Sequence, residues 1–416
     1  MNRTDAGVNL LGLRSHNTAL VLDLLRTAGP DGISRLELAE RTGLTPQAVS
    51  KITARLRQEG LAAEAGRRAS TGGKPRTVLR LVPEAGHAVG VHLDRDELRV
   101  VLARLDGRVV RERRAPLSLG AGARPVLDAV TREVTGLLEA APPGPPSATA
   151  TATEMSAGAA GAGDAEPSAV AADGTATAAD GSAVAVVAPD RIPVSPPLLG
   201  VGVALPGPLD HARGVLHRVT GFPEWDGFPL RDALAERLGA PVVVDKDTNA
   251  AALGLAVDGE GGSFACVHLG TGLGAGLVIG GTLHRGARTG AGEFGHQVIQ
   301  LDGPPCSCGN RGCVEALCLA ALGRGDAGEA ARVLGEGAAN LAGLLDIDAV
   351  LLGGRAIAAA PEPFLHGVTA VLRARARREG SPEDAVRVRL APHGAGAVAR
   401  GAAQLLLAPL FGRETG

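Results

Sequence analysis

The hydrophobic pattern near the start of the chain predicts three helices. Apolar residues recur at helical spacing over residues 17–28, over a segment that opens at Ser34, and over residues 47–60. Ser34 and Glu37 have the spacing of a capping box, which marks the start of a helix. Gly43 supplies a short turn between the second and third segments. Two helices joined by such a turn are typical of a helix-turn-helix, whose second helix enters the major groove of DNA.

A basic hairpin is expected directly after the third helix. Residues 61–82 hold two strand-like runs separated by the glycine-rich segment RRASTGGKPR. We therefore predict a winged helix-turn-helix DNA-binding domain over residues 1–82, in which the third helix reads base edges and the hairpin tip meets the DNA backbone or minor groove. The predicted DNA contacts are Gln47, Ser50, Lys51, Arg55, Arg67, Arg68, Lys74 and Arg76. An ordinary helical bundle with a charged surface is the alternative.

Charge is distributed unevenly between this head and the rest of the chain. Residues 1–82 carry 13 Lys or Arg against 7 Asp or Glu, a net charge of +6. The remainder carries 29 against 37, a net charge of −8, so the overall value of −2 hides the asymmetry. A small basic module attached to an acidic body indicates a polyanion-binding head, which supports the DNA-binding interpretation.

Beyond residue 82 the pattern changes to short apolar runs that alternate with helical stretches. Helices are expected near 125–139, after residue 246 and at the C-terminal end of the sequence. The runs typical of strands lie at 87–114, 198–205, 241–245, 264–280 and 349–353. This alternation predicts an α/β domain over residues 83–416.

The segment 141–197 interrupts that domain with a low-complexity sequence. It consists largely of Ala, Pro, Gly, Ser and Thr, with six acidic residues and a single basic one, Arg191. It has almost no large apolar side chains, so burial cannot offset the entropy of ordering it. We expect a disordered surface insertion, and a partner-binding segment is the alternative.

A cluster of metal-ligand residue types lies within eighteen residues in the second half of the chain. His296, Cys306, Cys308 and Cys313 supply one imidazole and three thiols, and glycines between them allow tight turns. This is the ligand set of a closed, tetrahedral zinc site, which leaves no position for an activated water. We therefore predict a structural zinc ion that folds and fixes a loop. Spare thiols or a disulfide are the alternative.

The sequence also bears on the compartment. No run of eighteen or more apolar residues is present, and the first residues lack the apolar core of a signal peptide. Three of the five cysteines belong to the metal motif, which suits a reducing compartment. We expect a cytoplasmic protein without a membrane partner.

The metal motif carries a family resemblance. The sequence GEFGH at residues 292–296, followed by CxCGxxGCxE at residues 306–315, resembles the ROK family, which groups sugar kinases with sugar-responsive repressors. The resemblance extends over residues 83–416 and implies a two-lobed fold of the actin-like ATPase type. With the winged helix included, the chain resembles the xylose and N-acetylglucosamine repressors of the family. That implies a transcriptional repressor that binds a double-stranded operator as a homodimer or homotetramer, under the control of a sugar or sugar phosphate.

The resemblance also implies residue roles. In the family the zinc loop shapes one wall of a sugar pocket, and the matching sugar contacts here are Asp247, Glu293, His296 and Glu315. Carboxylates accept hydrogen bonds from paired hydroxyls, and a metal-bound imidazole holds its second nitrogen in a fixed direction. Asp247 has an alternative role as a helix N-terminal acid that bonds backbone donors. Lys246 stands where the family has Asn, and it could pair with Asp245, Asp247 or an anionic ligand.

The phosphate-binding side departs from the family pattern. The DxGxT loop that holds Mg-ATP in ROK kinases is matched here by His92, Asp94 and Asp96. Without the glycine the backbone cannot approach a phosphate closely. Two carboxylates would also repel it, because like charges ~4 Å apart interact by ~4 kcal/mol at an effective dielectric constant of ~20. Arg95 could offset one of these charges. We therefore predict that the domain is not an enzyme.

Two further points stay open. The segment Gly270–Gly276 resembles the second phosphate loop of the family, but a glycine-rich turn between two strands explains it equally well. Two rival functions also remain. One is an active sugar kinase with a DNA-binding head, and the other is a repressor controlled by a protein partner, which the departure at Lys246 makes credible.

Overall fold

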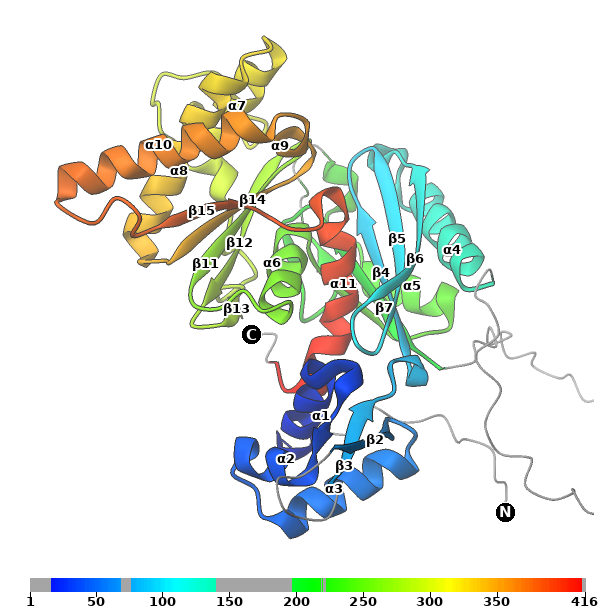
Figure 1. The fold of residues 1–416 in the computed structure, drawn as a ribbon. Helices are drawn as coiled ribbons and strands as arrows, with labels where there is room; N and C mark the ends of the chain where they lie inside the picture. Colours follow the sequence, from blue (N-terminus) through cyan, green and yellow to red (C-terminus); the bar gives the residue numbers. More distant parts are fainter. Residues whose placement is uncertain (1–15, 69–75, 140–196, 218, 220–221, 414–416) are drawn as a thin grey trace, which may run out of the picture.

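The computed structural model describes residues 16–68, 76–139, 197–217, 219 and 222–413. It consists of an N-terminal head and two lobes that flank a pair of central helices (Figure 1). The predicted insertion at 141–197 lies outside the described residues except for Pro197. Lys74 and the side chain of Arg68 lie outside them as well, so the predictions made for these parts stay predictions.

The head contains three helices and a three-stranded sheet. Its elements are α1 (His16–Ala28), β1 (Ile33–Ser34), α2 (Arg35–Thr42), α3 (Pro46–Gln58), β2 (Ala62–Arg68) and β3 (Arg76–Leu81), with strand order β1-β3-β2. The capping box forms as predicted, because Glu37 N donates to Ser34 Oγ at 3.2 Å and Ser34 N donates to Glu37 Oε2 at 2.8 Å. Gly43 ends α2 with a left-handed φ of 69°. The helix-turn-helix and the hairpin that follows it are confirmed.

The first lobe is a mixed sheet with helices on both faces (Figure 1). Its strands are β4 (His87–Leu93), β5 (Glu97–Arg104), β6 (Val109–Pro116), β7 (Leu198–Leu205) and β10 (Val242–Lys246), in the order β10-β7-β4-β5-β6. The strands β4, β5 and β6 form an antiparallel meander, and β7 and β10 join it in parallel. The helices α4 (Ala123–Glu139) and α5 (Leu230–Leu238) bury the core of this lobe. A small hairpin of β8 (Leu209–Asp210) and β9 (Val215–Leu216) lies beyond β7.

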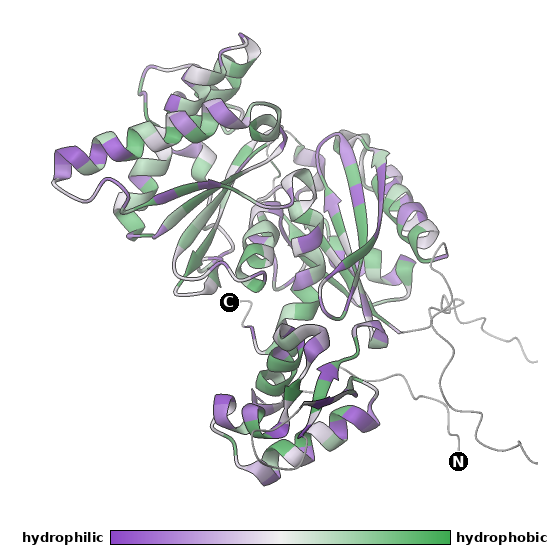
Figure 2. Ribbon diagram, viewed as in Figure 1, coloured by the Kyte–Doolittle hydropathy of each residue, from purple (hydrophilic) through white to green (hydrophobic). Residues whose placement is uncertain are grey.

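The second lobe is again a sheet with helices on both faces. Its strands are β11 (Phe264–Leu269), β12 (Leu273–Ile279), β13 (Thr282–His284), β14 (Ala349–Gly353) and β15 (Arg387–Leu390), in the order β13-β12-β11-β14-β15. Its helices are α7 (Val314–Gly323), α8 (Ala327–Leu345), α9 (Arg355–Ala359) and α10 (Pro361–Glu379). Figure 2 shows hydrophobic residues along the inner strands and a hydrophilic far end of α10. The inner strands and the helices α7, α8 and α10 together bury the core of this lobe.

Two central helices, α6 (Asp247–Val257) and α11 (Ala397–Leu407), lie between the sheets (Figure 1). α11 packs on β4 and β7 of the first lobe, α6 packs on β12 of the second lobe, and the two helices pack on each other. A Cβ atom at Gly401 would lie 1.8 Å from the carbonyl oxygen of Ala250, and one at Gly202 would lie 1.9 Å from that of Ala402. No side chain fits at such separations, so glycine is required where the helices and sheets meet.

α11 also connects the body to the head. It continues into a 3-10 turn at Ala408–Phe411, which packs on α1. Leu25 of α1 shares an apolar core with this turn, and the Arg26 guanidinium lies 5.2 Å from the centre of the Phe411 ring. By length and composition the stretch Gly394–Phe411 could cross a membrane, but 72% of it is buried inside the protein, as in a core helix. The head is therefore packed against the end of a helix that runs between the lobes.

Candidate functional site

The four predicted metal ligands come together in the second lobe. His296 ends a 3-10 turn at Phe294–His296, and Cys313 directly precedes α7. Cys306 Sγ lies 3.7 Å from His296 Nδ1, and Cys308 Sγ lies 3.7 Å from Cys313 Sγ. The ligand atoms of all four side chains lie within 4.8 Å of one another. No disulfide joins them, because all five cysteines of the chain are free. The cluster could hold one metal ion.

Glycines give the metal loop its shape. Gly309 and Gly312 have left-handed φ values of 95° and 65°. A Cβ atom at Gly312 would lie 1.5 Å from the carbonyl oxygen of Gln300, so no other residue fits there. Cys306 N donates to the carbonyl oxygen of Asn310 at 2.8 Å and closes the turn that carries Cys308. The thiols are therefore brought together by backbone geometry that the sequence itself requires.

The residues predicted to contact a sugar line one pocket between the lobes. Asp247, Glu293, His296 and Glu315 border a space of about 630 Å³, which includes open solvent at its mouth. The same pocket reaches the predicted remnant of the phosphate loop at Asp94. A concave site with several carboxylates offers acceptors for the hydroxyls of a polar ligand.

Glu315 is held in place by the start of α7. It lies two residues after the metal-cluster residue Cys313 and is buried. Its Oε2 accepts a hydrogen bond from the backbone N–H of Leu273 at 2.7 Å, which ties it to the first residue of β12. Its position in the pocket therefore depends directly on the metal loop.

Lys246 pairs with one of the predicted sugar contacts. Its Nζ donates to Glu293 Oε1 at 3.0 Å and to the carbonyl oxygen of Ala291 at 2.5 Å, and its side chain is 3% exposed. From the sequence, Asp245 and Asp247 were possible partners of Lys246. Asp245 instead forms a buried ion pair with Arg285, with the Arg285 Nη2 and Asp245 Oδ2 atoms 2.6 Å apart. Glu293 is therefore already engaged in the pocket.

Asp247, at the start of α6, shows features of both roles considered for it. Its Oδ1 accepts a hydrogen bond from Thr248 N at 2.6 Å, as expected for an acid at a helix N-terminus. It also lines the pocket. Burial raises the pKa of the Asp247 carboxyl, and His268 opposes that shift by favouring the charged form.

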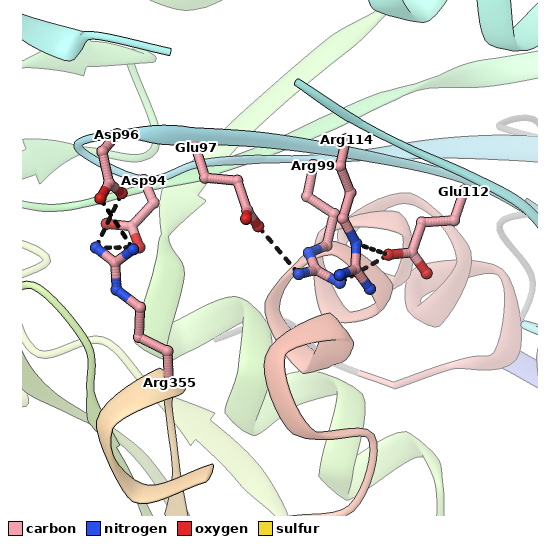
Figure 3. Close-up of polar contacts among 7 residues, drawn as sticks. All are labelled: Asp94, Asp96, Glu97, Arg99, Glu112, Arg114 and Arg355. Atoms are coloured by element: carbon pink, nitrogen blue, oxygen red, sulfur yellow. Dashed lines mark hydrogen bonds and ion pairs between the residues drawn. The ribbon is translucent and has the colours of Figure 1, made fainter. Parts of the chain in front are cut away.

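The two carboxylates of the altered phosphate loop are paired with the second lobe (Figure 3). Asp96 accepts two hydrogen bonds from Arg355, at 2.9 and 3.0 Å. Asp94 Oδ1 accepts a hydrogen bond from the hydroxyl of Thr271 at 2.9 Å. The cation that offsets these charges is therefore Arg355, whereas Arg95, which the sequence suggested, stacks 5.7 Å from the centre of the Phe222 ring. Arg355 was not predicted from the sequence; its place directly after Gly353-Gly354 marks a strand-to-helix turn but does not indicate its partner.

His92, the third changed residue of that loop, is buried beneath it. Its ring meets the ring of His268 edge-on, with centroids 6.4 Å apart. Burial lowers the pKa of His92 to about 3, so the imidazole is neutral near pH 7. A neutral ring at this position supplies no positive charge to a phosphate.

The glycine-rich segment Gly270–Gly276 has a packing role. A Cβ atom at Gly276 would lie 2.0 Å from the carbonyl oxygen of Thr248, so glycine lets α6 approach β12. Gly274 and Gly276 lie within β12. The turn itself, at residues 270–272, carries Thr271, which bonds Asp94 across the cleft. The alternative reading of a glycine-rich turn between strands therefore has direct support.

The predicted DNA-contacting side of α3 is exposed. Gln47, Ser50, Lys51 and Arg55 are all solvent-accessible, and so are Arg67 on β2 and Arg76 on β3. Arg55 Nε also donates to Glu59 Oε1 at 2.8 Å, which engages part of its guanidinium. In Figure 1 α3 lies on the far side of the head from the two lobes. The described part of the body therefore leaves this face open.

Comparison with known proteins agrees with both halves of the chain. A model of the ROK family matches residues 191–322, and a model of winged helix-turn-helix DNA-binding domains matches residues 29–62. A putative xylose repressor from Caldicellulosiruptor sp. (strain Rt8B.4) is 28% identical over 286 residues, which are 68% of this chain and 59% of that protein. The glucokinase of Thermotoga maritima is 42% identical over 124 residues, which are 29% of this chain and 39% of the kinase.

A solved structure is similar over nearly the whole chain. The crystal structure of a ROK family transcriptional regulator, a homologue of the E. coli MLC protein, has a TM-score of 0.65. It covers 95% of this chain and 97% of its own at 19% identity, a level at which it shows the fold alone. The chain is therefore similar to winged helix-turn-helix DNA-binding domains over residues 29–62 and to the ROK family over residues 191–322, and it has the fold of the ROK family regulator.

Proposed function

We propose that the protein is a transcriptional repressor that binds double-stranded operator DNA and responds to a sugar or sugar derivative. The observation that carries the proposal is the exposed, basic face of α3 in a chain whose ROK domain keeps a carboxylate-lined pocket. Lys51 and Arg55 have the charge to meet phosphates, and Gln47 and Ser50 are near enough to the start of α3 to reach base edges. The matched repressor, named for xylose, supports the same assignment.

The Cys-His cluster is proposed to bind structural zinc. Three thiolates and one imidazole complete a tetrahedral shell, so the ion would act as a brace rather than a reaction centre. It would fix the loop from His296 to Cys313 and with it two pocket residues, Glu293 and Glu315. Zinc bound here would couple the folding of the loop to the shape of the pocket.

The domain is proposed to have no kinase activity. Phosphoryl transfer depends on positioning the phosphates and neutralising their charge. The altered loop presents Asp94 and Asp96, both already engaged by the second lobe, and a buried neutral His92. Asp247 still lines the pocket, so a coupled ATP assay over a panel of hexoses and pentoses is the test. Turnover with any sugar would replace this proposal with the kinase alternative.

Coupling between pocket and head is proposed to run through the central helices. α6 begins in the pocket at Asp247, packs along α11, and α11 ends against α1 of the head. In a homodimer, closure of the lobes on a ligand would change the spacing of two heads, and half-site spacing decides operator binding. The ligand can shift this equilibrium only by its different affinity for the two states.

The test begins with the operator. Duplexes selected from a random pool by the purified full-length protein would be titrated at two salt concentrations. Lys51→Ala should weaken binding to all sequences and reduce the slope of log affinity against log salt by about one, since one phosphate contact is lost. Arg332→Ala on α8 of the body is the matched control and should leave the affinity and its salt dependence unchanged. Equal slopes for Lys51→Ala and the unaltered protein would contradict the proposed contact.

The effector is then sought by thermal-shift screening with neutral sugars and sugar phosphates. A sugar that raises the unfolding temperature should change operator affinity by at least about fivefold, the lower range of common allosteric coupling. If no sugar shifts the unfolding temperature while DNA binding is intact, control by a protein partner becomes the better explanation.

A further inference from the structure

Two side chains of the second lobe reach across the cleft to the altered phosphate loop. Arg355 bonds both carboxylate oxygens of Asp96, and its Nη2 lies 3.7 Å from Asp94 Oδ2 (Figure 3). Thr271 bonds the other oxygen of Asp94. We propose that Arg355, Thr271, Asp94 and Asp96 form a latch that holds the two lobes together, a role independent of any bound nucleotide.

On the first-lobe side, the carboxylates of the latch stand on a rigid corner. Asp94 and Asp96 lie in the tight turn between β4 and β5, where Asp94 N donates to the carbonyl oxygen of Glu97 at 2.9 Å. The following chain is pinned to the same turn, because Leu117 N donates to Asp96 O at 3.1 Å and Leu119 N donates to Arg95 O at 3.0 Å. The two carboxylates therefore move only with the first sheet.

The second-lobe side of the latch is equally fixed. Arg355 is the first residue of α9 and follows Gly354, whose φ is 96°. A Cβ atom at Gly354 would lie 2.3 Å from the carbonyl oxygen of Leu269, so the start of α9 is packed directly on the end of β11. Thr271 lies in the turn between β11 and β12. Arg355 and Thr271 are therefore both fixed to the second sheet and move with it.

Neighbouring ion pairs show what makes this contact unusual. Arg99 donates to Glu97 at 3.0 Å and Glu112 at 2.7 Å, and Glu112 also accepts from Arg114 at 2.7 Å (Figure 3). All of these residues belong to β5 and β6 of the first lobe, so they stabilise one sheet. Arg355 and Asp96, by contrast, lie 259 positions apart in the sequence and belong to different lobes. The latch pairs can therefore respond to lobe movement, as can the Lys246–Glu293 pair, whereas the pairs within β5 and β6 cannot.

The latch is weak enough to be reversible. The Arg355 and Asp96 side chains are 41% and 59% exposed, and exposed pairs of this kind shift an equilibrium by about twofold to fivefold. The bidentate geometry places the pair toward the upper part of that range. Asp94 and Thr271 are more buried and add a second arm that salt screens less. The latch would bias the lobes toward the closed arrangement without locking them.

A closed cleft brings together pocket residues from both sides. Gly207 and Lys246 belong to the first lobe, and Glu293 and Glu315 belong to the second. This consequence rests on the proposed function: loss of the latch should raise the dissociation constant of a sugar effector by the same about twofold to fivefold, since only the closed population binds. High salt should weaken effector binding in the same direction.

The latch itself is tested by hydrogen–deuterium exchange on the full chain without DNA or sugar. Arg355→Gln, Asp96→Asn and the double variant are compared with Arg114→Gln, which removes a nearby exposed Arg whose pair stays within one sheet. Arg355→Gln should speed exchange about twofold to fivefold in peptides covering residues 94–97 and in those covering residues 270–273. Asp96→Asn should do the same, and the double variant should add nothing further. Arg114→Gln should leave both peptides unchanged.

Three outcomes would overturn the latch. They are an Arg355→Gln variant that exchanges like Arg114→Gln, single-variant effects that add in the double variant, and faster exchange confined to residues 94–97, which would indicate local loosening only. Thr271→Val keeps the shape of the side chain and removes its hydroxyl, so it tests the second arm and should give a smaller increase on both sides. Because the exchange experiment uses no DNA or sugar, a negative result would rule out the latch but not the proposed function. A protein that failed to bind an operator would still allow the latch to be tested.

Discussion

The two ends of the interlobe pocket have different arrangements of the same kinds of side chain. At the metal-loop end, Asp247 at the start of α6 lines the pocket together with His296 and Glu315, which belong to or directly follow the Cys-His cluster. At the altered phosphate-loop end, Asp94 and Asp96 are bonded by Thr271 and Arg355. One end keeps acceptors facing the space where a ligand would sit, and the other uses its acceptors to join the lobes. The same kinds of side chain can therefore stay available to a ligand at one end of a pocket and form contacts between lobes at the other.

The largest expected effect comes from breaking the framework of the metal-loop end. Cys308→Ser should lose the bound metal and lower the unfolding temperature by at least about 5 °C, since several kcal/mol of stabilisation are lost and each shifts the unfolding temperature of a domain of ~150–250 residues by ~2–4 °C. The response to an effector should weaken with it, because Glu315 lies two residues after Cys313. Zinc analysis and differential scanning fluorimetry measure both. Cys318→Ala is the control, since this buried cysteine lies outside the cluster and should leave zinc content unchanged. Full zinc occupancy in Cys308→Ser would contradict the ligand assignment.

The next largest expected effect is the pH dependence of stability that His92 causes at the altered phosphate-loop end. The folded-state pKa of His92, about 3, lies below the ordinary value of 6.5, because protonating His92 in the folded protein would place a positive charge in a buried site. Stability from this group is present above pH 6.5 and is lost as the pH falls toward 3, by up to ~1.4 kcal/mol per pH unit. The surrounding charges do not cancel this penalty, because Asp94 favours the charged imidazole while His268, Arg99 and Arg355 oppose it.

A matched pair of variants isolates that contribution. His92→Leu removes the titrating group at similar volume, so its free energy of unfolding should fall less steeply between pH 6.5 and 4 than that of the unaltered protein. His366→Leu removes an exposed histidine of α10 and should keep the original slope. Urea unfolding at each pH gives the slopes. Parallel curves for His92→Leu and the unaltered protein would show that His92 is not buried in its neutral form.

The features that could be predicted from the sequence are those that depend on the spacing of nearby residues. The capping box of α2, the turn at Gly43 and the Cys-His cluster all lie within short stretches whose backbone geometry the residues themselves require. The candidate pocket residues followed from motif resemblance, and Asp247 and Glu315 line the same pocket. These features need no knowledge of how distant segments pack.

What the sequence could not predict depends on contacts between distant segments. Arg355 meets Asp96 across 259 residues, and nothing in either local pattern identifies the other as a partner. The packing of the end of α11 on α1 of the head is similar, because an apolar C-terminal helix fits many surfaces equally well. Electrostatic partners on flexible side chains are settled only once the lobes are placed.

The smallest expected effect concerns Lys246. This residue is an exception to the contrast between the two ends, because it pairs with an acceptor at the metal-loop end. Its Nζ donates to Glu293 Oε1 at 3.0 Å, so one acceptor of this end is already used. Lys246→Asn should free Glu293 for a hydroxyl and remove a positive charge from the pocket. The ratio of affinities for neutral sugars over sugar phosphates should then rise, by up to about tenfold for one charge a few Å from a phosphate. Calorimetry with one sugar and its phosphate measures the ratio, and Lys246→Arg, which keeps the charge, is the control. An unchanged ratio in Lys246→Asn would mean that Lys246 only braces Glu293, and the two ends of the pocket would then be more alike than their sequences suggest.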